Sequence, residues 1–292
     1  MTLTVIAGPT ASGKSALALG LAERTGGEIV SADSQQVYRH FDIGTAKPTA
    51  EERARVPHHL ISIVEPGDAF SAGRYQELAD AAIADITRRG GRPIVVGGTG
   101  LYLRFLLHGV IPAPQADPAV RARFQEELRA RGVAGLYADL LRVDPVTAAA
   151  THATDAMRIT RVLEIHAQTG QPASMQRRAH GFAERRHEYR LFVLDPPREA
   201  LNAAIDARTR RMFASGLVEE VKRLVALGHE NAAPMRSVGY AQALQVLRGA
   251  LTVEEAIAAA AQATRRYAKR QRTWFRKEKG AEWIAPPYAE IG

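Results

Sequence analysis

The residues best suited to chemistry in this sequence lie in a glycine-rich stretch close to its start. Residues 8–15 read Gly8-Pro9-Thr10-Ala11-Ser12-Gly13-Lys14-Ser15, the spacing GxxxxGK(S/T) that is typical of a phosphate-binding loop. Glycines let successive backbone N–H groups point at one anion, and a lysine adds a mobile positive charge. We therefore predict that this loop binds a phosphate or diphosphate, with Lys14 on its oxygens and the Ser15 hydroxyl as a ligand of Mg²⁺.

The residues on either side of the loop supply the elements that must position it. Residues 2–7 are apolar and partly β-branched, which predicts a buried strand. Residues 16–24 are rich in alanine and leucine, which predicts a helix that ends at Gly26 and Gly27. A strand, a glycine-rich loop and a helix in this order form the usual setting of a phosphate site.

A carboxylate stands at the end of the next predicted strand, residues 28–33. The carboxyl ends of parallel strands share one edge of a sheet, so Asp33 and the polar residues after it, Ser34, Gln35 and Gln36, are expected beside the phosphate loop. Two interpretations of Asp33 are open. It is a functional group, which we favour, or it caps a helix, since Asp-Ser after a strand is good capping chemistry.

A third predicted strand, residues 93–96, ends in the turn Gly97-Gly98-Thr99-Gly100. A nucleotide hydrolase usually carries a magnesium-binding aspartate at such a position. The glycines predict instead that the backbone of another molecule approaches closely there. A further strand is predicted over residues 58–63, where His58 and His59 have no nearby third ligand, which argues against a metal site.

The middle of the chain differs in character from its two ends. After Pro112-Ala113-Pro114 the patterns are helical, with one helix opening at Asp117-Pro118 and another at Asp155. The core pattern comprises a helix over residues 71–89, a strand over 188–195, and helices over 198–215, over 217–227 and from Thr252. We predict an α/β fold in which residues 1–110 and 182–292 form a P-loop NTPase-like core. Its parallel sheet is flanked by helices, and residues 111–181 form a helical insertion domain.

Composition and charge narrow the class of protein. The 292 residues include no cysteine, which excludes disulfides and thiolate chemistry and suits a reducing cytosol. Neither a signal peptide nor an apolar stretch long enough to span a membrane is apparent, so we expect a cytoplasmic protein without membrane contact. The net charge of +8 indicates a polyanionic partner such as nucleic acid, although an arginine-rich surface can also serve solubility alone.

A basic and aromatic run closes the last predicted helix. Helical spacing places the following residues on one side: Arg266, Lys269, Arg270, Thr273 and Lys277. Glu278 alone balances this run in the sequence, so we favour contact with phosphates. The alternative is a solvated helix face with Trp274 and Phe275 in the core.

Taken together, these motifs resemble the tRNA dimethylallyltransferase family, the delta-2-isopentenylpyrophosphate transferases that act on tRNA. The resemblance spans the chain in order and rests on residues 8–15, Ser31-Ala-Asp-Ser-Gln-Gln-Val-Tyr38, Asp42-Ile-Gly-Thr-Ala-Lys-Pro48, Gly97-Gly-Thr-Gly-Leu-Tyr102, Arg158-Ile-Thr-Arg161, Arg236-Ser-Val-Gly-Tyr240 and Lys269-Arg-Gln-Arg-Thr-Trp274. The phosphate loop alone is generic, whereas the motifs at 42–48 and 97–102 are highly specific. The chain departs from the family at Ser15, where many members carry threonine, and at Gln35-Gln36, where small or apolar residues are frequent.

The resemblance implies a prenyltransferase that uses Mg²⁺ and acts as a monomer. It would move a dimethylallyl group from dimethylallyl diphosphate to N6 of the adenosine 3′ of the anticodon, giving N6-(dimethylallyl)adenosine. Asp33 would take a proton from the adenine amine, Thr99 would orient the base, and Lys14 and Arg208 would neutralise the leaving diphosphate.

The implied partners are dimethylallyl diphosphate and the anticodon stem-loop of tRNA. The residues expected to contact the tRNA are Asp33, Ser34, Gln35, Gln36, Thr99, Arg121, Met157, Arg158, Ile159, Thr160, Arg161, Arg236, Arg266, Lys269 and Arg270. The basic members of this set would contact phosphates, which position an RNA without reading its sequence.

Two other functions share some of these sequence features. A small-molecule kinase would also combine a phosphate loop, a basic pocket and a helical lid, but the missing carboxylate after residues 93–96 counts against it. A non-catalytic RNA-binding protein with a nucleotide switch would leave Asp33 and Thr99 without a role.

Overall fold

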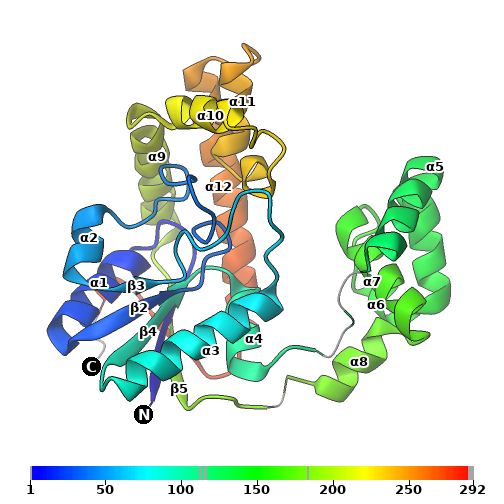
Figure 1. Cartoon of the computed structure of the whole chain (residues 1–292), viewed down its shortest axis with the longest axis horizontal. Coiled ribbons are helices and arrows are strands. Elements are labelled where there is room, and N and C mark those ends of the chain that lie inside the picture. Colours follow the sequence, from blue (N-terminus) through cyan, green and yellow to red (C-terminus); the bar gives the residue numbers. More distant parts are fainter. Residues whose placement is uncertain (1, 112–113, 115–116, 183, 289–292) are drawn as a thin grey trace. The chain divides into compact units, whose positions relative to one another are not determined.

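The structure is a computed structural model that describes residues 2–111, 114, 117–182 and 184–288 (Figure 1). The chain forms two compact units. Residues 1–107 and 186–292 make the first, and residues 108–185 make the second. No helix within the described residues has the length and apolar character that crossing a membrane requires.

A six-stranded parallel sheet forms the centre of the first unit, in the order β3-β2-β4-β1-β5-β6. The strands are β1 (Leu3–Ala7), β2 (Gly27–Ser31), β3 (His58–His59), β4 (Arg92–Gly97), β5 (Tyr189–Leu194) and β6 (Ala281–Ile284). The loops that follow β1, β2 and β4 therefore meet at one edge of the sheet, since these three strands are neighbours and run the same way.

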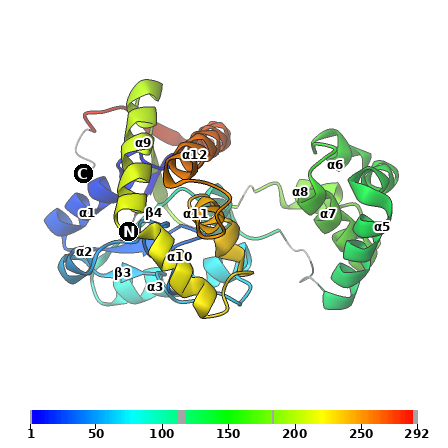
Figure 2. The ribbon, with the colours of Figure 1, turned by 90° about the horizontal axis from the view of Figure 1, so that it is seen from above.

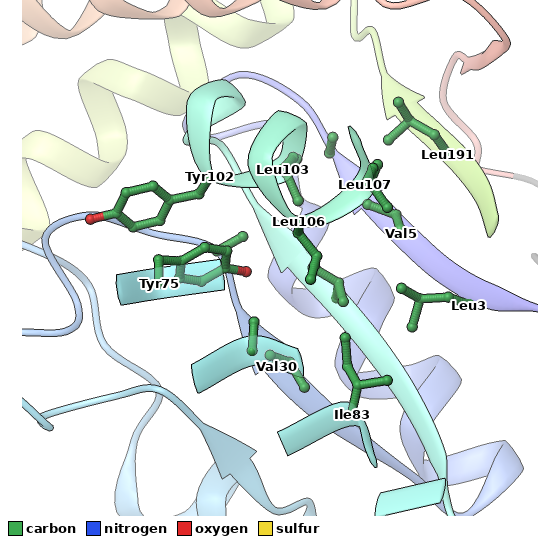
Figure 3. Packing of buried hydrophobic residues seen from close by; sticks show 14 of the residues in the cluster. Leu3, Val5, Val30, Tyr75, Ile83, Tyr102, Leu103, Leu106, Leu107 and Leu191 are labelled. Atoms are coloured by element: carbon green, nitrogen blue, oxygen red, sulfur yellow. The ribbon is translucent and has the colours of Figure 1, made fainter. Parts of the chain in front are cut away.

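Alternating residues of the strands supply two separate apolar cores. Val5, Val30 and Val95 face α3 (Ala72–Arg88) and α4 (Gly100–His108), where they pack with side chains such as Tyr75 (Figure 3). The residues next to them in sequence, Ile6, Ile29 and Ile94, face the opposite side, where α1 (Lys14–Thr25) contributes Leu19 and Leu21. Strands buried on both faces read as continuous apolar runs, which is why their pattern was visible in the sequence.

A second group of helices extends the first unit beyond the sheet. It consists of α9 (Arg198–Ala214), α10 (Leu217–Ala226), the short 3₁₀ helix Ala233–Arg236, α11 (Tyr240–Leu247) and α12 (Val253–Phe275). The short helix α2 (Ala50–Arg55) lies instead beside α1, where Arg55 pairs with Glu23. The long helices α9 and α12 lie side by side in both views (Figures 1 and 2), and an ion pair between Asp206 and Arg265 joins them. Buried side chains of α10 to α12 pack with Val37, Phe41 and Val64 from the loops after β2 and β3.

The loop after Phe41 is fixed to this helical group by one buried carboxylate. Glu220 of α10 is 3 % exposed and accepts hydrogen bonds from the backbone N–H groups of Asp42 and Ile43 and from the Tyr240 hydroxyl. The Tyr240 hydroxyl in turn accepts from the N–H of Gly44 at 3.1 Å. A buried charge is stable when it is hydrogen-bonded in this way, so the loop has a defined position.

The second unit is entirely helical in its described part. It contains α5 (Pro118–Val143), α6 (Pro145–Ala149), α7 (Ala156–Thr169) and α8 (Ala173–His180). The predicted caps are confirmed, because the side chains of Asp117 and Asp155 accept from the first backbone N–H groups of α5 and α7. Leu136, Leu140 and Ile159 are fully buried in its core.

The sequence-based prediction of a parallel sheet flanked by helices is confirmed, with three differences in detail. The strand predicted over residues 58–63 is formed only by His58 and His59, and Gly27 begins β2 rather than ending the preceding helix. The strand β6 was not predicted. Its residues Ala281–Ile284 are polar or half-exposed, so their pattern lacks the apolar run of a central strand.

A cluster of charges at the amino edge of the sheet leads to a test of stability. The Glu28 side chain, 12 % exposed, pairs with Arg89 and with His59. Hydrogen bonds from Arg89 lower the pKa of Glu28 from 4.5 to about 2. A carboxylate with a lowered pKa in the folded state stabilises the fold above its unfolded pKa, and this contribution is lost as the pH falls.

We expect Glu28→Gln to lower the free energy of unfolding by about 2 kcal/mol at neutral pH, a figure reduced for solvent screening of the exposed Arg89. Denaturant titrations should show the difference from the parent shrinking as the pH falls from 4.5 towards 2. As a control, Arg88→Ala removes the exposed ion pair between Arg88 and Asp85 of α3 and should change stability little. A constant difference at every pH would contradict this assignment.

Candidate active site

The phosphate loop adopts the conformation that its glycines predict. Gly13 has φ 88° and stands directly before α1, so the loop leads into the positively polarised N-terminus of that helix. Lys14 is partly exposed, and its ammonium group donates to the Pro9 carbonyl at 3.3 Å. Burial, together with the nearby Arg208, lowers the pKa of Lys14 to about 8. A site that already crowds two cations is suited to a ligand with several negative charges.

Arg208 of α9 reaches this loop as the resemblance implied. Its guanidinium donates to the Thr10 hydroxyl at 3.1 Å. Burial and Arg211 lower the pKa of Arg208, while Asp33 acts in the opposite direction. Lys14, Arg208 and Asp33 therefore interact electrostatically within one site, although they come from three distant parts of the sequence.

Two cavities meet at this site. The larger, of about 1130 Å³, is lined by Thr10, Ala11 and residues 13–15 of the phosphate loop and by residues between 42 and 53. The smaller, of about 320 Å³, is lined by residues including Ser34, Gln35 and Arg236. Both cavities share the following lining residues: Thr10, Asp33, Thr45, Arg208, Met212 and Tyr267. Asp33 thus borders both a phosphate-binding space and a second space next to it.

The structure shows Asp33 closing a turn rather than capping a helix. One carboxylate oxygen accepts from the backbone N–H groups of Gln35 at 2.8 Å and Gln36 at 3.3 Å, so Asp33 does close the turn after β2. The turn does not continue into a helix. Asp33 also lines both cavities, so its structural role leaves it available for chemistry.

Thr99 connects this turn to the one after β4. The Thr99 hydroxyl accepts from the Ser34 backbone N–H at 3.0 Å. The Tyr267 side chain of α12 is hydrogen-bonded to Thr99, and burial raises the pKa of Tyr267 to about 12. The Thr99 hydroxyl therefore links the turn that carries Asp33 to the Tyr267 phenol. Asp33 and Tyr267 line both cavities, whereas Thr99 is not among their lining residues.

The close approach predicted at Gly97–Gly100 occurs, but the partner is this chain itself. A Cβ on Gly98 would lie 2.2 Å from the Gln271 side chain, and one on Gly100 would lie 2.2 Å from the Trp274 ring. The expectation of a second molecule at this turn is therefore wrong, because α12 fills the space that the glycines leave.

Gln36, one of the residues expected to contact tRNA, is occupied by contacts within the protein. Its carbonyl oxygen accepts from the Ser31 hydroxyl at 3.1 Å, and its amide donates to the carbonyls of Thr45 and Ala46. Gln36 thus ties the end of β2 to the 42–48 loop. Arg236 is exposed and lines the smaller cavity.

The basic run on α12 presents one exposed face and one buried face. The exposed side chains include Arg266, Lys269, Arg270, Thr273 and Lys277. Phe275 is 1 % exposed and Trp274 packs against the core, as the alternative interpretation held for the aromatic residues. The run is also less unbalanced than its sequence indicated, since Arg265 pairs with Asp206 and Arg272 with Asp195.

The residues expected to bind tRNA in the second unit differ in exposure. Met157 is 86 % exposed and Arg158 is exposed beside it at the start of α7. Ile159 is fully buried in the helical core, so its side chain does not reach the surface, contrary to the expectation of an RNA contact. The Thr160 hydroxyl donates to the Ala156 carbonyl within α7.

Arg121 and Arg161 share a structural partner in the same unit. Both pair with Glu164, which is 3 % exposed, and Arg161 also donates to the Pro114 carbonyl at 2.8 Å. Pairing offsets the cost of burying the Glu164 carboxylate, so part of the charge of these arginines is used inside the protein.

Three residues of the site were not found from the sequence. Tyr267 and Gln271 lie inside the basic run, whose charges indicate an exposed surface rather than a site. Glu220 has the sequence pattern of an ordinary acidic residue on an amphipathic helix. Gln271 had one available signal, since it shares a helical face with Ala268 and Phe275 and is thus a polar residue on an apolar stripe.

Comparisons with known proteins agree with this geometry. A family described as IPP transferase matches residues 36–278, and one described as isopentenyl transferase matches residues 1–61. The chain is 61 % identical over 286 residues to a tRNA dimethylallyltransferase of Myxococcus xanthus, covering 98 % of this chain and 93 % of that protein. It is 56 % identical over 289 residues to one from Anaeromyxobacter sp., covering 99 % and 94 %.

Solved structures give the same result. The full-length tRNA isopentenylpyrophosphate transferase of Bacillus halodurans superposes with a TM-score of 0.71 at 38 % identity, covering 97 % of this chain and 89 % of that one. A eukaryotic dimethylallyltransferase acting on tRNA superposes with a TM-score of 0.80 at 29 % identity, covering 98 % and 74 %. The matched families, the relatives and the solved structures all lead to one conclusion: this chain belongs to the IPP transferase family.

Proposed function

We propose that this protein is a prenyltransferase that modifies tRNA. It transfers a dimethylallyl group from dimethylallyl diphosphate to N6 of the adenosine 3′-adjacent to the anticodon, giving N6-(dimethylallyl)adenosine. The observation that supports this reaction best is the position of Asp33, which lines both the cavity at the phosphate loop and the smaller cavity next to it. Each cavity would hold one substrate, with the Asp33 carboxylate between the two.

The larger cavity is suited to the diphosphate. The diphosphate oxygens would lie on the loop from Gly8 to Ser15. Lys14 and Arg208 would neutralise the charge that develops on the diphosphate as its bond to the dimethylallyl carbon breaks. The Ser15 hydroxyl is exposed and lines this cavity. Mg²⁺ commonly combines one or two protein oxygens with substrate phosphates, so Ser15 fits as its ligand here. When bound, Mg²⁺ would neutralise further charge on the diphosphate.

The smaller cavity is suited to the adenine. An exocyclic adenine amine is a weak nucleophile, because its lone pair is delocalised into the ring. Asp33 would accept a proton from N6 as the new N6–C bond forms and diphosphate leaves. Thr99 would orient the base through its hydrogen bond to Tyr267, which lines this cavity. A base in an RNA loop reaches such a pocket by leaving its stack at moderate cost.

The anticodon stem-loop would contact both the core, residues 1–110 and 182–292, and the insertion domain, residues 111–181. In the core, the exposed face with Arg266, Lys269 and Arg270 offers charges for phosphates, and Arg236 lines the smaller cavity. In the insertion domain, Met157 and Arg158 are the best exposed candidates. Residues of one copy line both cavities, which is compatible with a protein that acts as a monomer, as we propose.

A kinase function is less well supported. A kinase needs a carboxylate for the metal of ATP, and the end of β4 offers a glycine turn filled by α12 instead. The two reactions separate in one assay, in which the protein, dimethylallyl diphosphate, Mg²⁺ and tRNA are mixed without ATP and the nucleosides are analysed by mass spectrometry.

In that assay we expect Asp33→Asn to slow turnover by roughly 10²-fold or more, because a general base is lost. Asparagine keeps an oxygen that can accept from the N–H groups of Gln35 and Gln36, so the turn and the tRNA affinity should persist. A single-turnover rate close to that of the parent would remove Asp33 from this role.

The lowered pKa of Lys14 predicts a proton linkage. Near pH 8 the ammonium group is about half protonated in the free protein, and a bound diphosphate should raise its pKa again. Binding at pH 8 should then take up about half a proton. Calorimetry in two buffers of different ionisation enthalpy measures this uptake.

Lys14→Ala serves as the matched control. It should abolish the proton uptake and weaken diphosphate binding, while tRNA affinity stays near that of the parent. If the uptake were the same in this variant, the titrating group would be another residue.

The exposed face of α12 predicts the salt dependence of RNA binding. Replacing Arg266, Lys269 and Arg270 with alanine should reduce the slope of log affinity against log salt by roughly 2 to 3 units, at about 0.7 to 0.9 per phosphate contact. Affinity should fall equally for tRNAs with and without the target adenosine, because phosphate contacts carry no base information.

A control triple variant removes the same charge elsewhere. Arg24, Arg88 and Arg92 are exposed at the opposite, amino edge of the sheet. Their replacement by alanine should leave the slope nearly unchanged. Equal slopes for both triple variants would place the RNA surface away from α12.

A further inference from the structure

We infer that Gln271 is a positioning residue, which fixes the spacing between the diphosphate loop and the turn that carries Thr99. This inference rests on the proposed prenyl transfer for its kinetic consequence, but not for its structural one. Gln271 lies on the buried face of α12 and is 6 % exposed. An amide in such a place is costly unless both of its ends are hydrogen-bonded.

Both ends of the amide bind backbone groups of two different loops. The Gln271 carbonyl oxygen accepts from the Thr10 N–H at 2.8 Å. The Gln271 amide nitrogen donates to the Gly98 carbonyl at 2.8 Å. A single planar group therefore bridges residue 10 of the phosphate loop and residue 98 of the turn after β4.

Each bridged residue is linked directly to a group of the proposed chemistry. Thr10 accepts a hydrogen bond from Arg208 through its hydroxyl. Gly98 precedes Thr99, whose hydroxyl accepts from the N–H of Ser34, the residue after Asp33. The amide of Gln271 thus sets how far the cations that hold the diphosphate lie from the carboxylate that faces the amine.

The packing around Gln271 leaves little freedom for another arrangement. Gly98 has no room for a side chain because the Gln271 amide occupies the space, and Trp274, one turn later on α12, fills the space at Gly100 in the same way. Reacting atoms must be held close to their productive separation, and a misplacement of about 1 Å can cost roughly 10²-fold in rate. A loosened bridge should therefore reduce turnover more than it reduces binding.

The test compares Gln271→Met, which keeps the length of the side chain without its hydrogen bonds, with Gln262→Ala at an exposed site on the same helix. We expect kcat to fall by about tenfold or more in Gln271→Met, while tRNA affinity stays within about twofold of the parent. Gln271→Asn keeps the amide but is one methylene too short to reach both loops, so it should show the same loss. Gln271→Asn also serves as a second test variant if Gln271→Met does not fold.

Hydrogen exchange of the free protein gives a readout that is independent of catalysis. Peptides covering residues 8–15 and 97–100 should exchange faster in Gln271→Met. The Thr10 N–H loses its acceptor, and the Gly98 carbonyl loses its hydrogen bond to the Gln271 amide. Exchange in Gln262→Ala should match that of the parent. Unchanged exchange in both peptides, or a kcat within twofold of the parent, would overturn the inference. A fall in tRNA affinity equal to the fall in kcat would also overturn it, since Gln271 would then act through the RNA. If the parent made no prenylated tRNA, the proposed function would fail while the exchange result still decided the bridge.

Discussion

The parallel pairing of β2, β4 and β1 is the constraint on which the rest of the site depends. Parallel strands place their carboxyl ends at one edge, and these three are neighbours in the sheet. Each ends in a loop of different chemistry: glycines and a lysine after β1, a carboxylate after β2, and a compact glycine turn after β4. Residues almost one hundred positions apart in sequence are thereby brought to one site before any side-chain contact is considered.

Electrostatics then distinguishes a binding site from a merely polar edge. Arg208 lowers the pKa of Lys14, Arg211 lowers that of Arg208, and burial lowers both. Such a cluster destabilises the free protein slightly and is relieved when an anion binds, so the protein carries part of the charge complementarity in advance. Asp33 opposes this repulsion, since its carboxylate raises the pKa of both cations.

The sequence predicted those features that depend on local chemistry and regular periodicity. The phosphate loop, the buried strands, the caps at Asp117 and Asp155 and the edge position of Asp33 follow from spacing and residue type alone. What it did not predict depends on contacts between distant segments. The partner that fills the turn at Gly98 and Gly100, the pairing of Arg121 with Glu164 and the burial of Ile159 become visible only when helices pack.

The helix α12 shows why a charge run is an incomplete guide to function. With 3.6 residues per turn, residues 266, 269 and 270 share a face that excludes residues 268, 271 and 275, so one helix can meet solvent and the core at once. The same segment offers arginines and a lysine to the outside and an amide and two aromatic rings to the inside. Because the inner face touches both the phosphate loop and the turn after β4, α12 belongs to the structural frame of the active site as much as to its proposed RNA surface. A basic run of this kind is therefore best interpreted face by face, since the residues that hold the reacting groups in place carry no charge at all.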